Sequence, residues 1–288
     1  MDCMSRHTLL VSGGALRGPF SVPVIEHVWE QHGPPEELGG TSIGALHCAA
    51  ISGGDVDSMR RLWMTVDKRK QLLSIPVDLF GGGLADGVVS MKRARKILRR
   101  NHIGLRSKIP VHVGIVDAAS GEVRQVPLTG PYDRVLDCVF ASASLSPAME
   151  IAHYWHEGKK RIGYDGGLFE VLPRAVGELV AGDRVTAIFH SPITAAGRRK
   201  PTSQRKVSTA WGMLGSQLDD IVDRAVLERD MPYLMGLADR GVIVDVYAPE
   251  TWGDVGPSWS YDAEWRDHRL AAGDRAVSRG PIRLERRP

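Results

Sequence analysis

The sequence predicts an α/β fold with three layers, α/β/α, in which helices cover both faces of a mainly parallel sheet. Short runs of strand length alternate with segments of helical pattern along most of the chain. That alternation is typical of strand–helix–strand units, which place their strands in parallel. The strand-like runs end at glycine-rich turns. No change in composition marks a second domain, so we expect a single domain over residues 1–288.

Each predicted strand is a short run that ends at turn residues. The runs are residues 7–12, 111–117, 122–128, 161–167, 184–191 and 242–249. The runs at 111–117 and 122–128 flank a turn of small residues, which predicts an antiparallel hairpin. Residues 33–40, GPPEELGG, are weak by composition, and we assign a strand there only because a small-residue turn and a helical segment come directly after them.

The predicted helices lie between these strands. Pro19 opens the first helix, because its missing N–H costs little in the first turn. Residues 43–54 are small and apolar and end at paired glycines, as a buried helix does. The other predicted helices are residues 55–67, 88–100, 173–182 and a long segment near 207–230. Residues 193–288 therefore supply helices, one strand and a basic C-terminal tail.

Composition narrows the class of protein. A hydrophobic fraction of 43% and a charged fraction of 25% are those of a globular protein with a sizeable core. Three cysteines make a disulfide framework an unlikely design, so we expect a reducing compartment. The N-terminal apolar run is too short for a signal peptide, and no window reaches the length of a membrane span. These features predict a cytoplasmic protein, with no metal and no cofactor.

Ser42 lies in the stretch GGTSIGAL, with Gly40 two residues before it and Gly44 two residues after it. Gly-x-Ser-x-Gly between a strand and a helix is the pattern of a nucleophile elbow. The turn is tight, so the residues near the serine must lack bulk. The hydroxyl then projects near a helix N-terminus, which favours an incoming oxyanion. A glycine-rich turn with a serine cap explains the same five residues equally well.

Residues 12–18, SGGALRG, form a glycine loop after the first predicted strand. Gly13 and Gly14 allow backbone amides to point into a cavity, where they can bind phosphate or a tetrahedral oxyanion. Ala15 occupies the middle glycine of a dinucleotide fingerprint, which makes a nucleotide site the weaker interpretation. Arg17 can hold an anionic group or pair with a surface acid.

Asp165 ends a predicted strand and is followed by Gly166 and Gly167. Two glycines let the backbone bend sharply and approach another loop. An ordinary Asp-Gly turn is the common explanation for such a sequence.

Together, the glycine loop, the serine elbow and the Asp-Gly-Gly block resemble the patatin-like phospholipase family. The resemblance extends from about residue 8 to about residue 192 and includes ASASLSPAMEI at 141–151. It implies that Ser42 is the nucleophile and Asp165 the base, without a histidine. It places the oxyanion hole at Gly13, Gly14 and Ala15. The remaining motif residues that it implies are Arg17, Gly18, Gly40, Gly44, Gly166 and Gly167.

The resemblance implies a serine hydrolase that cleaves acyl esters of lipids through an acyl-enzyme. An acyltransferase or a thioesterase would use the same two residues, and a non-catalytic lipid-binding relative would keep the fold. A Ser-Asp-His triad that uses His190 or His268 stays open as an alternative. The chain also departs from the family at Ala15, where glycine is usual, and at Ser146, where proline is usual.

Basic residues gather in the helix at 91–100, in the loop at 198–206 and in the C-terminal tail. Such clusters attract an anionic membrane surface, at about 1 kcal/mol per basic residue near it. A solvated helix face explains them as well. Aromatic residues do not alternate with these cations, so we expect no nucleic acid.

Overall fold

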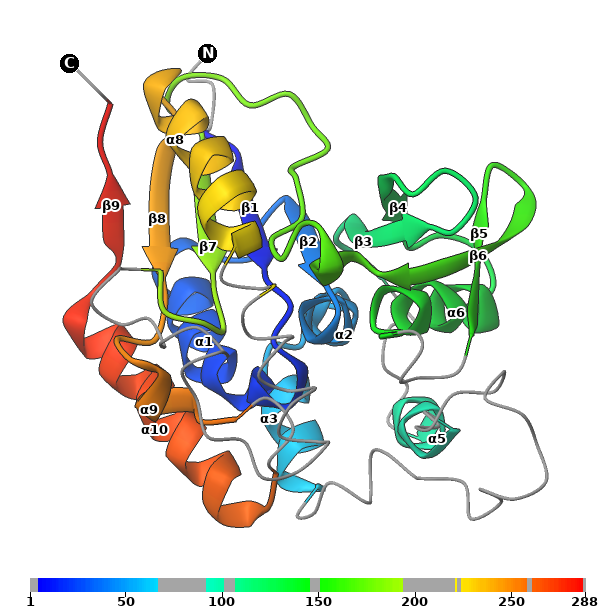
Figure 1. Ribbon diagram of the computed structural model, residues 1–288. Coiled ribbons are helices and arrows are strands. Elements are labelled where there is room, and N and C mark those ends of the chain that lie inside the picture. Colours follow the sequence, from blue (N-terminus) through cyan, green and yellow to red (C-terminus); the bar gives the residue numbers. More distant parts are fainter. Residues whose placement is uncertain are drawn as a thin grey trace.

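The computed structural model describes residues 5–66, 92–100, 107–145, 151–193, 221, 224–257 and 261–286. A nine-stranded sheet runs through this part of the chain (Figure 1). In sheet order its strands are β5 (Ala152–His156), β6 (Lys159–Asp165), β3 (Val111–Asp117), β2 (Glu37–Thr41), β1 (His7–Val11), β7 (Arg184–Ile188), β8 (Ile243–Tyr247) and β9 (Ile282–Leu284), and β4 (Val123–Pro127) pairs with β3.

The five central strands, from β3 to β8 in sheet order, run parallel to one another. Strands β4, β5, β6 and β9 are antiparallel to their neighbours and lie toward the ends of the sheet. The predicted α/β fold with a mainly parallel sheet is therefore confirmed. The predicted hairpin is also confirmed, as β3 and β4.

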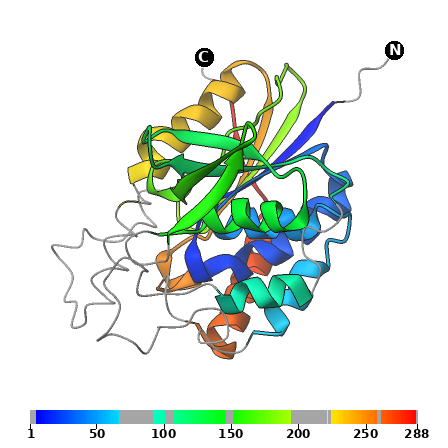
Figure 2. The ribbon, with the colours of Figure 1, turned by 90° about the vertical axis from the view of Figure 1, so that its right-hand side faces the viewer.

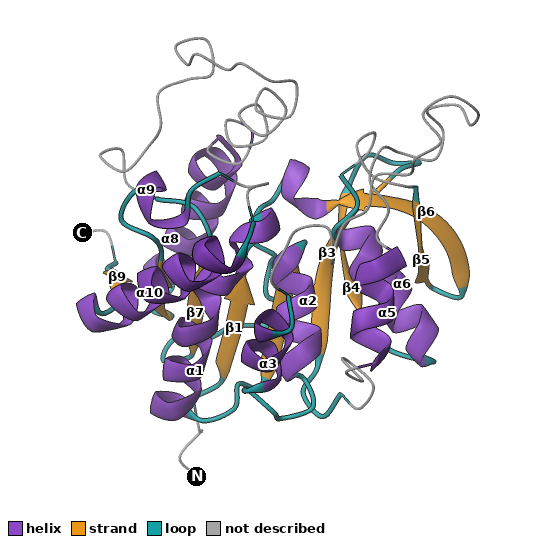
Figure 3. Ribbon diagram, turned by 90° about the horizontal axis from the view of Figure 1, so that it is seen from below, coloured by secondary structure: helices purple, strands orange, loops and turns teal. Residues whose placement is uncertain are grey.

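Strand β1 contributes side chains to two separate cores, because successive residues of a strand point to opposite faces. Leu9 and Val11 belong to a core shared with α1 (Ser21–His32), α2 (Ile43–Ile51), α3 (Ser58–Met64), α6 (Tyr132–Ser142) and α10 (Ala263–Arg279). Leu10 belongs to a second core with α8 (Met231–Asp239) and the segment 171–179. Helices therefore pack on both faces of the central strands, and Figure 3 shows them around the sheet from below.

Beside strands β3 to β6, helix α6 packs against the sheet, and α5 (Lys92–Arg100) lies on the outer side of α6 (Figure 2). Two ion pairs join the helices: Arg95 binds Asp137 at 2.8 Å and Arg99 binds Asp133 at 2.6 Å. Two cations of the predicted basic helix are thus matched by carboxylates of α6.

Residues 173–182 are not helical, so that prediction is wrong. The amides of Val176 and Gly177 donate to the carboxylate of Glu37, at 2.8 and 3.3 Å. The amide of Ala175 donates to the hydroxyl of Tyr233 at 2.9 Å. Side chains from distant parts of the chain take up these donors, and a helix starting at Pro173 would need those of Val176 and Gly177 for its own hydrogen bonds. The proline and glycine at the ends of this segment carried no information about those partners.

Strand β5 and helix α10 were not predicted, although α10 has clear end signals. Asp262 caps its start by accepting from the amide of Trp265 at 2.8 Å, and Gly280 ends it with a φ of 79°. Part of the predicted basic tail is strand β9, which pairs with β8. Most of the helix predicted near 207–230 lies outside the described residues, as do the loop at 198–206 and the shifted proline after Ser146.

Candidate active site

Ser42 lies at the sharp turn between β2 and α2. Its backbone has a φ of 56° and a ψ of −120°, a conformation that side-chain-bearing residues rarely adopt. A Cβ on Gly44 would lie 2.1 Å from the carbonyl oxygen of Val11, and one on Gly40 would lie 2.4 Å from that of Gly44. Glycine at these two positions is therefore what lets the turn close against β1. This is the strained strand–turn–helix geometry of a nucleophile elbow.

Asp165 lies at the end of β6 and is only 2% exposed. Its carboxylate accepts a hydrogen bond from the amide of Gly167 at 2.8 Å, and the nearby side chain of Ser42 lowers its pKa. A Cβ on Gly166 would lie 2.5 Å from the carbonyl oxygen of Gly114, so this glycine lets the Asp-Gly-Gly turn approach β3. The structure thus brings Ser42 and Asp165 together, although they are far apart in the sequence.

Burial raises the pKa of Asp165 to about 7, and the hydrogen bonds from Ser42 and Gly167 only partly oppose that rise. An ordinary Asp has a pKa of about 3.9 and is a weak base. The carboxylate of Asp165 holds a proton much more strongly, which suits a general base working near neutral pH. The pKa therefore favours proton transfer from the hydroxyl of Ser42.

Two of the three predicted oxyanion-hole amides are available. The amide of Gly13 donates to the carbonyl of Val171 at 2.8 Å, so its assignment as an oxyanion donor is wrong. Its donor is needed to hold the glycine loop against the segment after Asp165. Within the described residues, no hydrogen-bond acceptor is found for the amides of Gly14 and Ala15. Both residues line the pocket that contains Ser42 and Asp165.

The same pocket has an apolar side. Leu145, Leu168, Val171 and Ile221 line it together with the glycine loop, Ser42 and Asp165. An apolar wall next to the predicted nucleophile and the amides of Gly14 and Ala15 suits an ester with a hydrocarbon acyl chain. Among the described residues, no group of three or more His, Cys, Asp or Glu side chains could hold a metal ion.

Comparison with known proteins decides the family. The model of the family described as patatin-like phospholipase matches residues 9–176, more than half of the chain. The chain belongs to the patatin-like phospholipase family. The crystal structure of VipD from Legionella pneumophila is similar, with 13% sequence identity and a TM-score of 0.41, over 98% of this chain and 68% of that one. No curated protein matched.

Ala15 is the point at which this patatin-like chain departs from its family inside the site. Its φ is 50°, in the left-handed region that favours glycine. The alanine therefore keeps the backbone conformation of a glycine position, at a cost of about 1–2 kcal/mol. At Gly14, a Cβ would lie 2.3 Å from the Cβ of His190, so no larger residue fits there.

The alanine-serine segment holds both predicted catalytic residues by hydrogen bonds. Ser142 Oγ accepts from the amide of Ser42 at 3.0 Å and donates to the carbonyl of Gly114 at 2.7 Å. The carbonyl of Ser144 accepts from the amide of Asp165 at 2.9 Å. The sequence flagged this segment only through the family resemblance and did not reveal these two contacts.

Arginines on both sides of the glycine loop hold it in place. Arg17 is buried, and its Nε donates to the carbonyl of Gly256 at 2.9 Å. Arg269 of α10 donates to three carbonyl oxygens, those of Leu16, Val255 and Pro257, at 2.7, 2.8 and 2.9 Å. Arg269 lies outside the matched residues 9–176 and was missed, because nothing local marks a buried arginine.

The two histidines considered for a triad are engaged elsewhere. Nδ1 of His190 lies 3.0 Å from the carbonyl of Ser12, and Nε2 of His268 lies 3.1 Å from the carbonyl of Gly253. In the described part of the chain, neither has a hydrogen bond with Ser42 or Asp165. Burial lowers the pKa of His190 to about 4, so the ring is neutral behind the glycine loop.

His47 and Cys48 have structural surroundings. Nε2 of His47 accepts from the indole N–H of Trp63 at 2.8 Å, and Nδ1 lies 2.8 Å from the hydroxyl of Ser21. The thiol of Cys48 is buried and donates to the carbonyl of Gly39 at 3.3 Å. A Cβ on Gly18 would lie 2.5 Å from the Trp63 ring, so this motif glycine allows the ring to pack under the loop.

Proposed function

We propose that this chain is a serine hydrolase that cleaves acyl esters of lipids, with Ser42 as the nucleophile and Asp165 as the base. The observation that carries the proposal is that Ser42, strained at its elbow, and the buried carboxylate of Asp165 line the same pocket, where the side chain of Ser42 lowers the pKa of Asp165. Membership of the patatin-like phospholipase family supports a lipid ester as the substrate.

In the first half of the reaction, Ser42 Oγ attacks the ester carbonyl while its proton moves to the carboxylate of Asp165. The amides of Gly14 and Ala15 donate to the resulting oxyanion, and each well-placed donor is worth about 3 kcal/mol. The tetrahedral intermediate then collapses. The alcohol leaves with the proton from Asp165, and the acyl group stays on Ser42 as an ester.

In the second half, water attacks the acyl-enzyme and Asp165 accepts a proton from it. Collapse of the second intermediate returns that proton to Ser42 Oγ and releases the fatty acid. An alcohol or thiol in place of water would make the same residues an acyltransferase. The apolar wall of Leu145, Leu168, Val171 and Ile221 contacts the acyl chain in both halves.

Labelling with a fluorophosphonate probe tests this proposal, with the modified peptide identified by mass spectrometry. We expect an adduct on Ser42 in the wild type and none in Ser42→Ala. Ser120→Ala, in the exposed turn between β3 and β4, is the matched control and keeps the adduct. A folded wild type that never labels, or full ester hydrolysis by Ser42→Ala, would contradict the proposal.

Contact with an anionic membrane and a cytoplasmic location stay predictions. Helix α5 was the first candidate for that contact, but Arg95 and Arg99 already pair with carboxylates of α6. Among the described residues, no helix is both long enough and apolar enough to cross a membrane. Any membrane contact made by α5 would rest on its remaining cations, of which Lys96 and Arg100 are exposed.

A further inference from the structure

In the described part of the chain, one face of strands β5 and β6 carries exposed side chains. Helix α6 covers the opposite face, where Ala152 and Tyr154 join the first core. The second core, under α8, draws on β1, β7 and β8, and no described residue of β3, β5 or β6 belongs to it. Figure 2 shows α6 and α5 on the same side of these strands. We call the side with these exposed side chains the open sheet face.

The strand register defines which residues occupy the open sheet face. His153 pairs with Ile162, and Val116 pairs with Tyr164. These positions alternate with Tyr154 and Gly163, which face α6. Ile151 directly precedes β5 and is 46% exposed, and Ile162 is 40% exposed. The face therefore joins two exposed isoleucines to an aromatic residue on adjacent strands.

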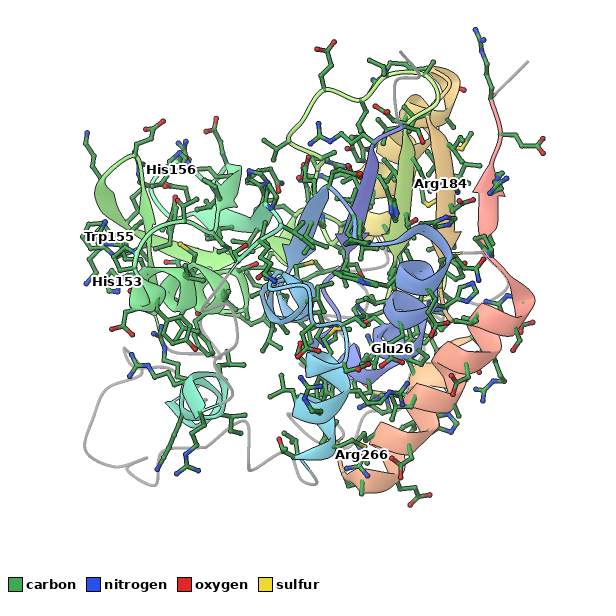
Figure 4. All side chains as sticks on the ribbon, turned by 180° about the vertical axis from the view of Figure 1, so that it is seen from behind. Glu26, His153, Trp155, His156, Arg184 and Arg266 are labelled. Atoms are coloured by element: carbon green, nitrogen blue, oxygen red, sulfur yellow. The ribbon has the colours of Figure 1, made fainter. Side chains whose placement is uncertain are left out.

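The formal charge on the β5 and β6 residues of this face is the cation of Lys160. On β5 and β6 its residues are His153, Trp155, Lys160, Ile162 and Tyr164, and none of them is acidic. His153 and Lys160 are exposed. The guanidinium of Arg134 lies 4.0 Å from the ring centroid of Trp155, which adds a cation at the rim. In Figure 4, His153 and Trp155 lie along the outer edge of the molecule.

We propose that the open sheet face docks the protein on an anionic lipid membrane. The proposal rests on the proposed function for its choice of a lipid partner. Isoleucine side chains enter the apolar part of a bilayer, Trp and Tyr suit its interface, and lysine is attracted to anionic headgroups. Tyr164 on this face directly precedes Asp165 on β6, so the docking surface begins one residue from the candidate active site, and the two side chains point to opposite faces of the sheet.

Other occupants fit the face less well. Surfaces that bind single-stranded nucleic acid combine cations with aromatic rings, and exposed isoleucines do not contribute to that binding. A second copy of the chain, docked through the same face, would bring its own Lys160 against the first. An anionic membrane matches the apolar residues and the cations together.

Vesicle co-sedimentation tests the proposal on the full chain with Ser42→Ala, so that no lipid is consumed. The vesicles are pure phosphatidylcholine and a mixture of phosphatidylcholine with phosphatidylserine. We expect Ile162→Ser to lower binding about fivefold on both. Lys160→Ala should lower binding about fivefold on the anionic vesicles alone, equivalent to about 1 kcal/mol for a basic residue at the surface.

Two matched controls separate this face from the rest of the surface. Ile282→Ser changes an isoleucine of similar exposure, 38%, on β9 at the other end of the sheet. Lys96→Ala removes an exposed cation of α5. Neither should change vesicle binding by more than a small factor.

Several results would overturn the docking proposal. They are no vesicle binding by the Ser42→Ala chain, equal losses in Ile162→Ser and Ile282→Ser, or a larger loss in Lys96→Ala than in Lys160→Ala. A dimer that Ile162→Ser dissociates in analytical ultracentrifugation, without vesicle binding, would assign the face to a second copy. Hydrolysis of a soluble short-chain ester by the wild type is measured separately, so vesicle binding without hydrolysis rejects only the proposed function.

Discussion

Replacing Asp165 by Asn should stop ester hydrolysis and at the same time stabilise the fold at neutral and alkaline pH. The carboxyl is 2% exposed, and burial raises its pKa from 3.8 to about 7. Between these values the unfolded chain releases the proton while the folded chain keeps it, so stability falls as pH rises. At about 1.4 kcal/mol per pH unit, the loss is complete above about pH 7 and amounts to about 4 kcal/mol.

Asn has the shape of the protonated acid and does not titrate, so Asp165→Asn lacks this loss. Its side-chain oxygen can accept from the amide of Gly167, and its NH₂ can donate to Ser42 Oγ. We therefore expect the free energies of unfolding of wild type and variant to agree near about pH 4. They should diverge by up to about 4 kcal/mol near about pH 8, in favour of the variant.

Urea denaturation at the two pH values measures this difference, and fluorophosphonate labelling reports the loss of the base. Asp230→Asn is the matched control, because burial also raises the pKa of Asp230 to about 7. That variant should gain stability over the same pH range and still label at Ser42. Equal stability of wild type and Asp165→Asn at both pH values would refute the reasoning, since it would mean that Asp165 is ionised in the folded protein without cost.

Three further substitutions test the supports of the site. Ser142→Ala leaves the amide of Ser42 without its acceptor and should cost about 1–3 kcal/mol in urea denaturation, with slower labelling; unchanged labelling would contradict its role. Arg269→Met should slow fluorophosphonate labelling at least tenfold, beyond any effect of lost stability, and Arg269→Lys should restore part of the labelling rate. Equal labelling rates in the two variants would mean that the arginine acts only through packing. Ala15→Gly removes about 1–2 kcal/mol of left-handed strain against an entropy cost of about 0.4–1 kcal/mol. It should therefore keep or raise the unfolding midpoint and retain hydrolysis, and lost hydrolysis would show that the methyl group is needed.

The central positions of the site could be predicted because their chemistry constrains the local sequence. An elbow with a φ of 56° at Ser42 needs glycines where β1 and α2 approach it, and those glycines are visible as Gly40 and Gly44. The bend after Asp165 likewise needs Gly166. Close backbone contacts of this kind can be predicted from the sequence, because only glycine fits at such positions.

Positions that depend on distant partners could not be predicted. The sequence predicts that Gly13 donates to an oxyanion, but its amide donates to the carbonyl of Val171 instead. The sequence predicts a helix at residues 173–182, but three amides of this segment donate to the side chains of Glu37 and Tyr233. In both cases the competing acceptor lies far away in the chain. The propensities of neighbouring residues do not include a hydrogen bond to a distant acceptor. Such tertiary contacts override the secondary structure that the local sequence favours.

The glycine loop shows that residues outside the family match at 9–176 also support the candidate site. The loop carries strain at Ala15, and strained backbone persists only where the surroundings fix it. Its fixed points are the carbonyl of Val171, the side chain of His190 packed against Gly14, and Arg269, which binds the carbonyl of Leu16. The latter two lie beyond residue 176, where the family match ends. Residues beyond the family match thus help to hold the loop that carries the proposed oxyanion amides, even though they form no motif that we recognise in the sequence.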